Sequence, residues 1–347
     1  MNVTDYLQTW AASYKEDFVN NIMPFWMRYG LDHKNGGVYT CLDRDGRLMD
    51  TTKSVWFQGR FGFIAAYAYN QIEQNPDWLA ASRSCIDFME KHCFDKDGRM
   101  FFEVTEEGLP LRKRRYVFSE CFAAIAMSEY ALASGDRTYA EKALDLFKRI
   151  LRNLATPGLL EPKYLPTLQA RGHSITMILI NTASRIRAAI SDPILDTQIN
   201  ESIAAIRRYF MHPEFKALLE MVGLDGELID TCNGRVINPG HCIETAWFIL
   251  EEAKHRHWDK DLVQMGIRIL EWSWEWGWDK EYGGIINFRD CRNFPVQDYS
   301  QDMKFWWPQT EAIIATLYAY QATCDEKYLD MHRQISDWTY AHFPDKE

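Results

Sequence analysis

The sequence predicts an all-α fold, an (α/α)6 barrel with short β-hairpins at one end. Three observations favour it. Helical periodicity covers most of the 347 residues. Short extended segments with Asp/Gly turns separate alternate helices. Helix pairs recur at a spacing of about 60 residues, a weak internal repeat. A repeated helical hairpin of this length closes most simply into a ring of inner and outer helices.

The apolar residues recur at helical spacing in eleven segments, and their starts carry capping or breaker residues. We therefore expect helices at about residues 4–28, 56–73, 76–93, 118–134, 137–155, 173–190, 194–211, 241–256, 259–276, 305–324 and 325–342.

Hairpin turns are indicated by four segments that combine Asp with Gly: Asp32–Gly37, Asp43–Gly46, Asp95–Gly98 and Asp279–Gly284. Each supplies Gly or Asp where the backbone needs an unusual φ. In the predicted barrel these hairpins lie where the inner helices begin.

One domain over residues 1–347 is expected, because no Ser/Gly linker or change of composition divides the chain. A closed ring of six pairs needs twelve helices, whereas eleven are predicted. We therefore expect the sequence to lack its natural C-terminal segment and, with it, the last helix.

The composition excludes some classes of function. The net charge of −10 argues against nucleic acid as a partner, and the basic run Arg112–Arg115 is short and isolated. No run of 18 apolar residues is present, so no membrane segment is predicted. The N-terminus lacks a secretory signal pattern and the eight cysteines form no CxxC pair, which favours a cytoplasmic protein with reduced thiols. Aromatic residues make up 14%, and some could stack on sugar rings.

The strongest catalytic candidate is His241, in Asn238-Pro-Gly-His-Cys-Ile-Glu-Thr-Ala-Trp247. The Pro-Gly breaker places His241 in the first turn of a helix, with Glu244 on the same face. A helix N-terminus disfavours the imidazolium, so we expect His241 to be neutral, as a proton-abstracting base must be.

Two further helix starts combine polar and aromatic residues. In the first, Trp56 and Arg60 share a face, and Arg60 is either a structural ion-pair partner or a functional cation. In the second, Ser119 reads as a capping residue, whereas Glu120 is either a cap or the partner of Arg115 behind a site.

Two more helix starts contribute candidates. His173 begins a helix as His241 does, and is either a core residue or part of the site. Lys304, Trp307 and Glu311 lie on one side of the last start. Glu311 is either a carboxylate favoured by the helix dipole or one desolvated behind tryptophans, with a raised pKa.

Other site chemistries lack their motifs. The sequence contains no HExxH, GxGxxG after a strand, Walker loop or GxSxG elbow. A His/Glu pair at i, i+3 could ligate a metal, but no third ligand of suitable spacing stands out, so no metal site is predicted.

With these residues in view, the chain resembles the N-acylglucosamine 2-epimerase family, which includes the renin-binding proteins. The resemblance is carried, in family order, by Val55-Trp-Phe-Gln-Gly-Arg60, Arg112-Lys-Arg-Arg-Tyr-Val-Phe-Ser-Glu120, Asn238-Pro-Gly-His-Cys-Ile-Glu244 and Lys304-Phe-Trp-Trp-Pro-Gln-Thr-Glu311. The second segment favours the N-acetylglucosamine branch over cellobiose epimerases or mannose isomerases.

The resemblance implies interconversion of N-acetyl-D-glucosamine and N-acetyl-D-mannosamine in a central cavity of the barrel, with Arg60, His241, Glu244 and Glu311 as active-site residues. Trp56, Glu120, His173, Lys304 and Trp307 are expected to bind substrate. The family's second catalytic histidine, in a Phe-His-x-Pro-Arg segment, is not in this sequence. The resemblance also implies a homodimer. No cofactor is expected for the chemistry, and activation by a nucleotide such as ATP, which some members need, is left open.

The expected mechanism removes the proton at C2 of the open-chain sugar, α to the C1 carbonyl, and returns it on the other face. His241 is one base, with His173 a poorer substitute for the missing histidine; Arg60 holds the oxygens. The alternatives are another aldose epimerase or isomerase of the superfamily, a glycoside hydrolase using Glu244 and Glu311, and a non-catalytic sugar- or protein-binding module.

Overall fold

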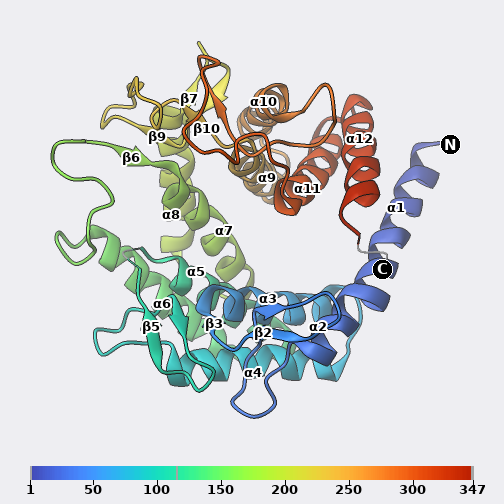
Figure 1. Ribbon diagram of the computed structural model, residues 1–347, viewed down its shortest axis with the longest axis vertical. Coiled ribbons are helices and arrows are strands. Elements are labelled where there is room, and N and C mark those ends of the chain that lie inside the picture. The colour runs from blue at the N-terminus through green and yellow to red at the C-terminus, as the bar shows by residue number, and fades with distance from the viewer. Residues whose placement is uncertain (1, 115, 345–347) are drawn as a thin grey trace. The chain divides into compact units, whose positions relative to one another are not determined.

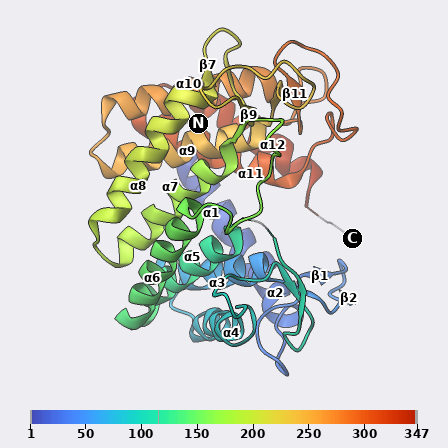
Figure 2. The ribbon, with the colours of Figure 1, turned by 90° about the vertical axis from the view of Figure 1, so that its left-hand side faces the viewer.

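The computed structural model describes residues 2–114 and 116–344 and is mostly helical (Figures 1 and 2). It contains two compact units. The first comprises residues up to 163 together with 185–195, and the second comprises 164–184 together with residues from 196 onward. The expectation of a single domain stays a prediction.

The first unit holds six α-helices and a π-helical turn among its described residues: α1 (Val3–Asp17), η1 (Phe18–Ile22), α2 (Met23–Tyr29), α3 (Val55–Gln71), α4 (Pro76–His92), α5 (Phe118–Ser134) and α6 (Arg137–Ala155). Its strands are β1 (Cys41–Leu42), β2 (Leu48–Asp50), β3 (Lys53–Ser54), β4 (Glu103–Val104) and β5 (Pro110–Arg112), paired as an antiparallel β1–β2 hairpin and an antiparallel β3–β4–β5 sheet.

The helices of the second unit are α9 (Pro239–His255), α10 (Lys260–Gly277), α11 (Trp306–Thr323) and α12 (Lys327–His342). Helices α7 (His173–Ala189) and α8 (Pro193–Ala205) each contribute residues to both units, and η2 (Ile206–Phe210) continues α8. The strands of the second unit are β6 (Arg171–Gly172), β7 (Met211–His212), β8 (Ala217–Leu218), β9 (Met221–Val222), β10 (Val236–Ile237) and β11 (Arg289–Asp290). They form the antiparallel pairs β6–β9, β7–β8 and β10–β11.

Inner and outer helices differ in how they are buried. Every residue from Ser119 to Ala131 of α5 is buried, so this helix is covered on all sides. Helix α6 buries one stripe, as an outer helix does, and lies beside α5 (Figure 2). In the first unit α3 also packs on α4 and α5. In the second, α9 packs on α10 and α11, and α11 packs on α12.

The predicted helices agree with the observed ones to within a few residues at most ends. The first predicted helix, 4–28, is interrupted by the π-helical turn η1 just before Pro24. Pro24 has no backbone N–H to donate to the preceding turn, and a local change of hydrogen-bond register is one way in which a helix accommodates such a residue.

The four predicted turns are also present. The backbone N–H of Asp32 bonds to the carbonyl of Gly37, and Asp279 and Gly284 form the same bond. Gly37 and Gly284 have φ values of +74° and +79°, where a side chain would be strained.

A glutamine clamps each of these two turns to the following helix. Gln58 accepts from the backbone N–H of Val38 and donates to its carbonyl, at 2.8 and 2.6 Å. Gln309 makes the same pair of bonds with Ile285, at 2.7 and 2.8 Å. The hairpins are thereby attached to the first turns of α3 and α11, where the sequence places its candidate residues.

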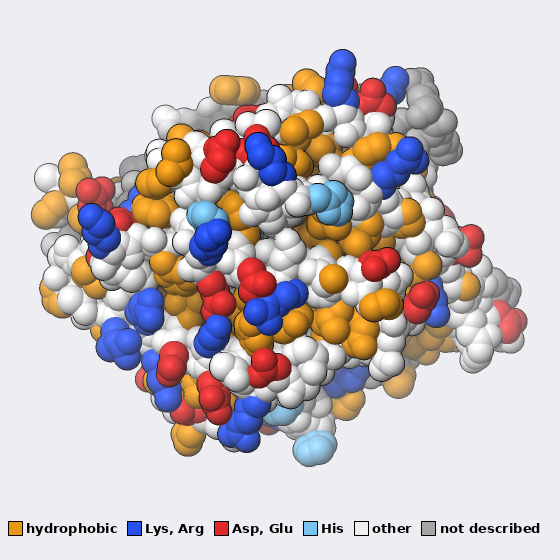
Figure 3. All heavy atoms as spheres, turned by 90° about the horizontal axis from the view of Figure 1, so that it is seen from below, with side chains coloured by type: hydrophobic (Ala, Val, Ile, Leu, Met, Phe, Trp, Pro, Cys, Tyr) orange, Lys and Arg blue, Asp and Glu red, His pale blue; other side chains and the backbone are white. Residues whose placement is uncertain are grey.

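The surface carries charges of both signs. Basic and acidic side chains are interspersed over the face drawn in Figure 3. In the described part of the chain, no helix combines the length and the apolar character needed to cross a bilayer. All eight cysteines are free thiols; Cys41 and Cys324 are exposed.

Candidate active site

His173 and His241 begin two helices of the second unit, and short strands place them. Strand β6 ends at Gly172 and pairs with β9, so α7 starts at His173 beside the β8–β9 segment. Strand β10 leads into Asn238, whose side chain caps α9 by accepting from the backbone N–H of His241. Both helices therefore start beside the same extended segment.

Glu220 lies in that segment, between β8 and β9, and faces both histidines. Its Oε1 lies 3.1 Å from Nδ1 of His241 and 3.9 Å from Nδ1 of His173. The side chain of His173 is 1% exposed, whereas that of His241 is 31% exposed. The structure thus brings the two predicted histidines to one carboxylate, and His241 is the more accessible of them.

Thr245, one turn along α9, determines the proton positions on His173. Its hydroxyl donates to the carbonyl of His241 at 2.8 Å and lies 3.2 Å from Nε2 of His173. With its single proton given to that carbonyl, the hydroxyl accepts at the second contact, and this assigns the hydrogen of His173 to Nε2. Nδ1 of His173 is then a buried lone pair, without a hydrogen-bond partner in the described residues.

The protonation of His241 differs from the sequence-based expectation. Burial lowers its pKa, but the carboxylates of Glu220, Glu244 and Glu311 outweigh burial and raise the pKa to about 9. The expectation of a neutral His241 is therefore wrong at neutral pH. A helix N-terminus contributes about 0.3–1 kcal/mol, too little to oppose several nearby carboxylates.

His173 has the opposite character. Burial lowers its pKa to about 4, against the attraction of Glu220, and the positive charge of His241 acts in the same direction as burial. One neutral and one protonated imidazole therefore share Glu220 at neutral pH. This is an asymmetric pair that can hold a proton at a defined position.

One tryptophan contacts Glu311 and another contacts His241. Glu311 of α11 accepts a hydrogen bond of 2.6 Å from the indole Nε1 of Trp247, on α9. The ring of Trp307 lies 5.3 Å from that of His241, centroid to centroid. The structure thus groups His241, Glu311 and Trp307 in the second unit, as the sequence predicts, and Glu244 lies on the same helix as His241.

Lys304 has a specific structural contact. Its ammonium group donates to Asp279 at 2.6 Å, and the two side chains are 16% and 18% exposed. The ion pair joins the Asp279–Gly284 turn to the segment before α11. Its role in binding substrate stays a prediction.

The remaining candidates belong to the first unit. Arg60 is exposed, and its guanidinium lies 4.4 Å from the centroid of the Phe122 ring. It makes no ion pair within residues 2–114 and 116–344, so the structural alternative left open for it is not seen there. Trp56 packs against Phe102 and Phe122, with its indole N–H buried and without a hydrogen-bond partner among the described residues.

Glu120 is 2% exposed and accepts a 2.8 Å bond from the backbone N–H of Met100, so it clamps a turn as Gln58 does. Burial raises its pKa. The suggested pairing with Arg115 lies outside the described residues.

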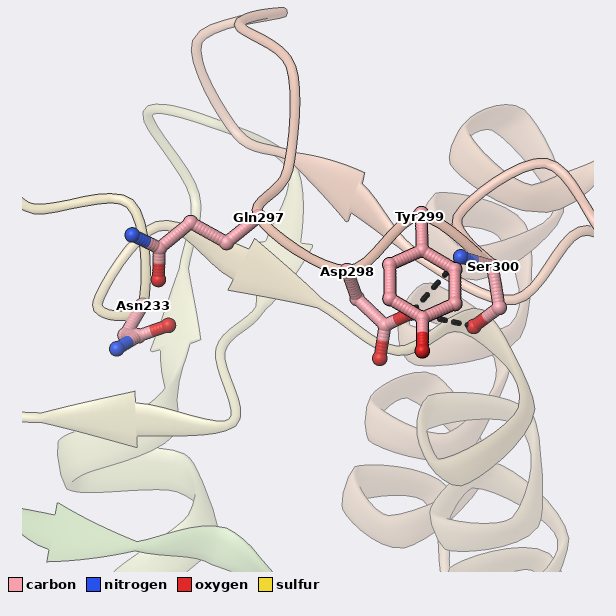
Figure 4. A pocket seen from close by; sticks show the side chains of 5 residues that line it. All are labelled: Asn233, Gln297, Asp298, Tyr299 and Ser300. Carbon is pink, nitrogen blue, oxygen red and sulfur yellow. Dashed lines mark hydrogen bonds between the residues drawn. The ribbon is translucent and has the colours of Figure 1, made fainter.

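A separate hollow of about 610 Å³ lies on the second unit, lined by Asn233, Gln297, Asp298, Tyr299 and Ser300 (Figure 4). Asp298 is held by Ser300, whose backbone N–H and hydroxyl both donate to it. None of the candidate site residues lines this hollow. No group of three or more potential metal ligands is found in the described residues.

Two residues beside the histidines, Glu220 and Thr245, are not among the candidates that the sequence predicts. A signal for Glu220 was present, because it is the single charge in the apolar run Ala217–Val222. A charge in such a run is costly unless it has a partner. Thr245 gave no signal, since a threonine inside a helix is ordinary.

Comparisons with known proteins identify the family of this chain. The family model for N-acylglucosamine 2-epimerase (GlcNAc 2-epimerase) matches residues 37–347. The N-acylglucosamine 2-epimerase of Bos taurus is 30% identical over 338 residues, 95% of this chain and 80% of the relative. The cellobiose 2-epimerase of Ruminococcus albus is 23% identical over 360 residues, 96% of this chain and 87% of the relative.

Among solved structures, the cellobiose 2-epimerase from Bacillus thermoamylovorans B4167 superposes with a TM-score of 0.85 at 20% identity, covering 98% of this chain and 89% of that one. The fold class is therefore the (α/α)6 barrel, as predicted. Fold and relatives together define the class as a sugar 2-epimerase, an isomerase. The chain belongs to the N-acylglucosamine 2-epimerase family.

Proposed function

We propose that this protein interconverts N-acetyl-D-glucosamine and N-acetyl-D-mannosamine by moving a proton at C2. The observation that carries the proposal is the paired helix-start histidines on Glu220, within a chain of the N-acylglucosamine 2-epimerase family. The named relatives support the amino sugar as substrate.

The reaction begins from the open-chain sugar. A base on one face of the sugar accepts the C2 proton as the C2–H bond breaks. The electron pair of that bond forms the C1–C2 double bond, and the carbonyl electrons move to O1. Because C2 of this sugar carries nitrogen, the intermediate is an enolate with its charge on O1. Return of a proton to the opposite face of C2 restores the carbonyl and inverts the centre.

His241 supplies one of the two proton-transfer groups. It carries a proton at neutral pH, because burial lowers its pKa less than the nearby carboxylates raise it, to about 9. In one direction His241 delivers this proton to C2. In the reverse direction the neutral imidazole left behind abstracts it, as microscopic reversibility requires.

The other residues assist that transfer. Glu311, held by the indole of Trp247, and Glu244 orient the sugar hydroxyls and assist ring opening. The family resemblance assigns Arg60 to the enolate oxygen, a role that suits an exposed guanidinium without an ion pair in the described chain. Trp307 and Lys304 are proposed to contact the sugar, with Trp56, Glu120 and His173 supporting the site.

Solvent deuterium tests the chemistry. The protein is incubated with N-acetylmannosamine in heavy water, and C2 of substrate and product is followed by NMR. We expect the epimer to appear with deuterium at C2. Epimer without C2 label would overturn the proton-transfer mechanism, and release of new reducing ends from oligosaccharides without any epimer would favour a hydrolase using Glu244 and Glu311.

Replacement of the proposed catalytic group should abolish most turnover. For His241→Gln we expect a loss of about 10³-fold in kcat. His255→Gln, an exposed position at the other end of α9, is the matched control and should retain wild-type activity. Equal activities of the two variants would remove His241 from the mechanism. The homodimer, the cytoplasmic location and activation by a nucleotide stay predictions.

A further inference from the structure

We propose that Glu220 is a positioning residue for the proposed reaction: its carboxylate holds Nδ1–H of His241, leaves Nε2 to exchange the proton with the sugar, and keeps that proton on His241 rather than on His173. The inference rests on the proposed function for its chemistry. The contact itself is a property of the fold and can be tested without turnover.

The backbone around Glu220 is held at both helix starts. Its carbonyl accepts from the backbone N–H of His173 at 3.1 Å, and its own N–H bonds to the carbonyl of Val236, just before α9, at 3.3 Å. The thiol of Cys242 donates to the carbonyl of Leu218 at 3.3 Å. The carboxylate is thus carried by a segment fastened to both elements that supply the histidines.

The two histidines meet this carboxylate differently. His241 lies at hydrogen-bond distance, 3.1 Å from Nδ1 to Oε1, so Nδ1 carries a hydrogen and donates it. His173 lies at 3.9 Å, too far for a hydrogen bond, and its Nδ1 is the unprotonated nitrogen because Nε2–H is given to Thr245. The carboxylate therefore fixes the tautomer of one imidazole while the hydroxyl fixes that of the other.

The charges around His241 come from several elements. Glu220 lies on the β8–β9 segment, Glu244 on α9, Glu311 on α11, and His173 on α7. Glu220 is the one with a hydrogen bond to the ring among the described contacts. Its charge should consequently act on the proton of His241 more strongly than either other carboxylate, since Coulomb interactions fall with distance.

Two-base epimerisation needs one proton shared between its bases, so activity falls at high pH when His241 loses it. Glu220→Gln keeps the shape and an acceptor for Nδ1–H but removes the charge. We expect the high-pH limb of kcat/KM to move down by about one pH unit or more and kcat to fall about 10- to 100-fold, with KM changed little.

A matched control exists on the same unit. Glu214 contacts Nδ1 of His212 at 3.0 Å, a more exposed carboxylate–imidazole pair at a similar distance outside the proposed site. Glu214→Gln should leave both limbs of the profile where they are. Glu220→Asp, which keeps the charge on a shorter side chain, should restore the position of the high-pH limb while recovering part of kcat.

A spectroscopic readout separates this inference from the proposed function. The nine histidines are labelled with ¹⁵N, and His241 is assigned by the signal missing from His241→Gln. We expect the neutral form in the wild type to be the Nδ1–H tautomer, and the titration of His241 to shift to lower pH in Glu220→Gln. Both measurements are independent of sugar turnover.

The outcomes are distinct. An Nε2–H tautomer for neutral His241, or an unmoved titration and pH limb in Glu220→Gln, overturns the role of Glu220. The expected NMR result in a protein that exchanges no C2 proton overturns the proposed function and leaves the Glu220–His241 contact standing. The expected NMR result with the shifted high-pH limb supports both.

Discussion

The turn before α3 and the turn before α11 share the sequence pattern Asp-x-x-x-Gly-Gly, at Asp32–Gly37 and Asp279–Gly284. Each begins with an aspartate, Asp32 or Asp279, that binds a lysine further along the chain at 2.6 Å. A glutamine stands five residues after the lysine in both cases and clamps the turn. The residue two places later differs: it is Arg60 in the first repeat and Glu311 in the second.

The comparison teaches that the repeat keeps its scaffold and changes the side chain that follows it. The two lysines also differ in burial and in their hydrogen bonds. Lys53 is fully buried and gives all three protons, to Asp32, Gly36 and Glu106. Lys304 is partly exposed and, within residues 2–114 and 116–344, bonds to Asp279 alone. The first lysine is fully hydrogen-bonded within the fold, whereas the second has further ammonium protons that no described residue accepts.

The largest effect is expected for Lys53→Met. The change leaves Asp32 buried without its cation, and breaking a buried pair in this way costs about 3–5 kcal/mol of unfolding free energy. Urea unfolding followed by circular dichroism measures it. A loss below that of Lys304→Met would break the distinction between the two repeats.

The clamping glutamines should behave alike in both repeats. Gln58→Leu and Gln309→Leu each leave a buried N–H and a buried carbonyl without a partner, at about 1–3 kcal/mol per group. Gln309→Leu also removes a bond to the partly exposed carbonyl of Phe305, at 2.9 Å. The same urea experiment should give losses that agree to within about 1 kcal/mol, inside the usual context dependence. Strongly unequal losses would show that the two clamps are not equivalent.

Acid should test the first ion pair. Burial raises the pKa of Asp32, but hydrogen bonds from Lys53 and Asn35 outweigh it and hold the pKa at about 2, below its ordinary value of 3.8. A carboxyl group with a lowered pKa in the folded protein stabilises the fold fully at pH values above its pKa in the unfolded chain. That stabilisation is lost as the pH falls toward the pKa in the folded protein. We expect about 2 kcal/mol to be lost between pH 4 and pH 2. Unfolding free energies measured across this range should fall less steeply in Asp32→Asn.

The smallest stability effect is expected for Lys304→Met. A partly exposed ion pair contributes about 0–1 kcal/mol, so the unfolding free energy should change little. If Lys304 contacts substrate, KM for the amino sugar should instead rise several-fold. Unchanged KM together with a large loss of stability would make Lys304 a structural residue like Lys53.

Much of the helical framework could be predicted from the sequence, because the apolar period and capping residues are local. The turns Asp32–Gly37 and Asp279–Gly284 were equally readable from their paired glycines. The roles of Gln58 and Gln309 were not, because a clamp depends on which backbone groups come near.

The candidate site could be predicted in part. His173, His241, Glu311 and Trp307 are candidates because polar and aromatic residues at a helix start are a local signal. The charge state of His241 was missed, since it depends on Glu220, which lies 21 residues away in sequence, and on Glu311 from another helix. Local helix-dipole reasoning cannot sum charges that only tertiary structure assembles.

The exposed thiols provide two positions at which dyes can be attached. Cys41 is in the first unit and Cys324 in the second, and both are exposed, whereas Cys232 is partly exposed. The other five thiols are buried: Cys85, Cys93, Cys121, Cys242 and Cys291. In a Cys232→Ser background, a donor and an acceptor dye attached at Cys41 and Cys324 would report the distance between these two positions in solution. Titrating sugar into the doubly labelled protein would then show whether ligand changes that distance.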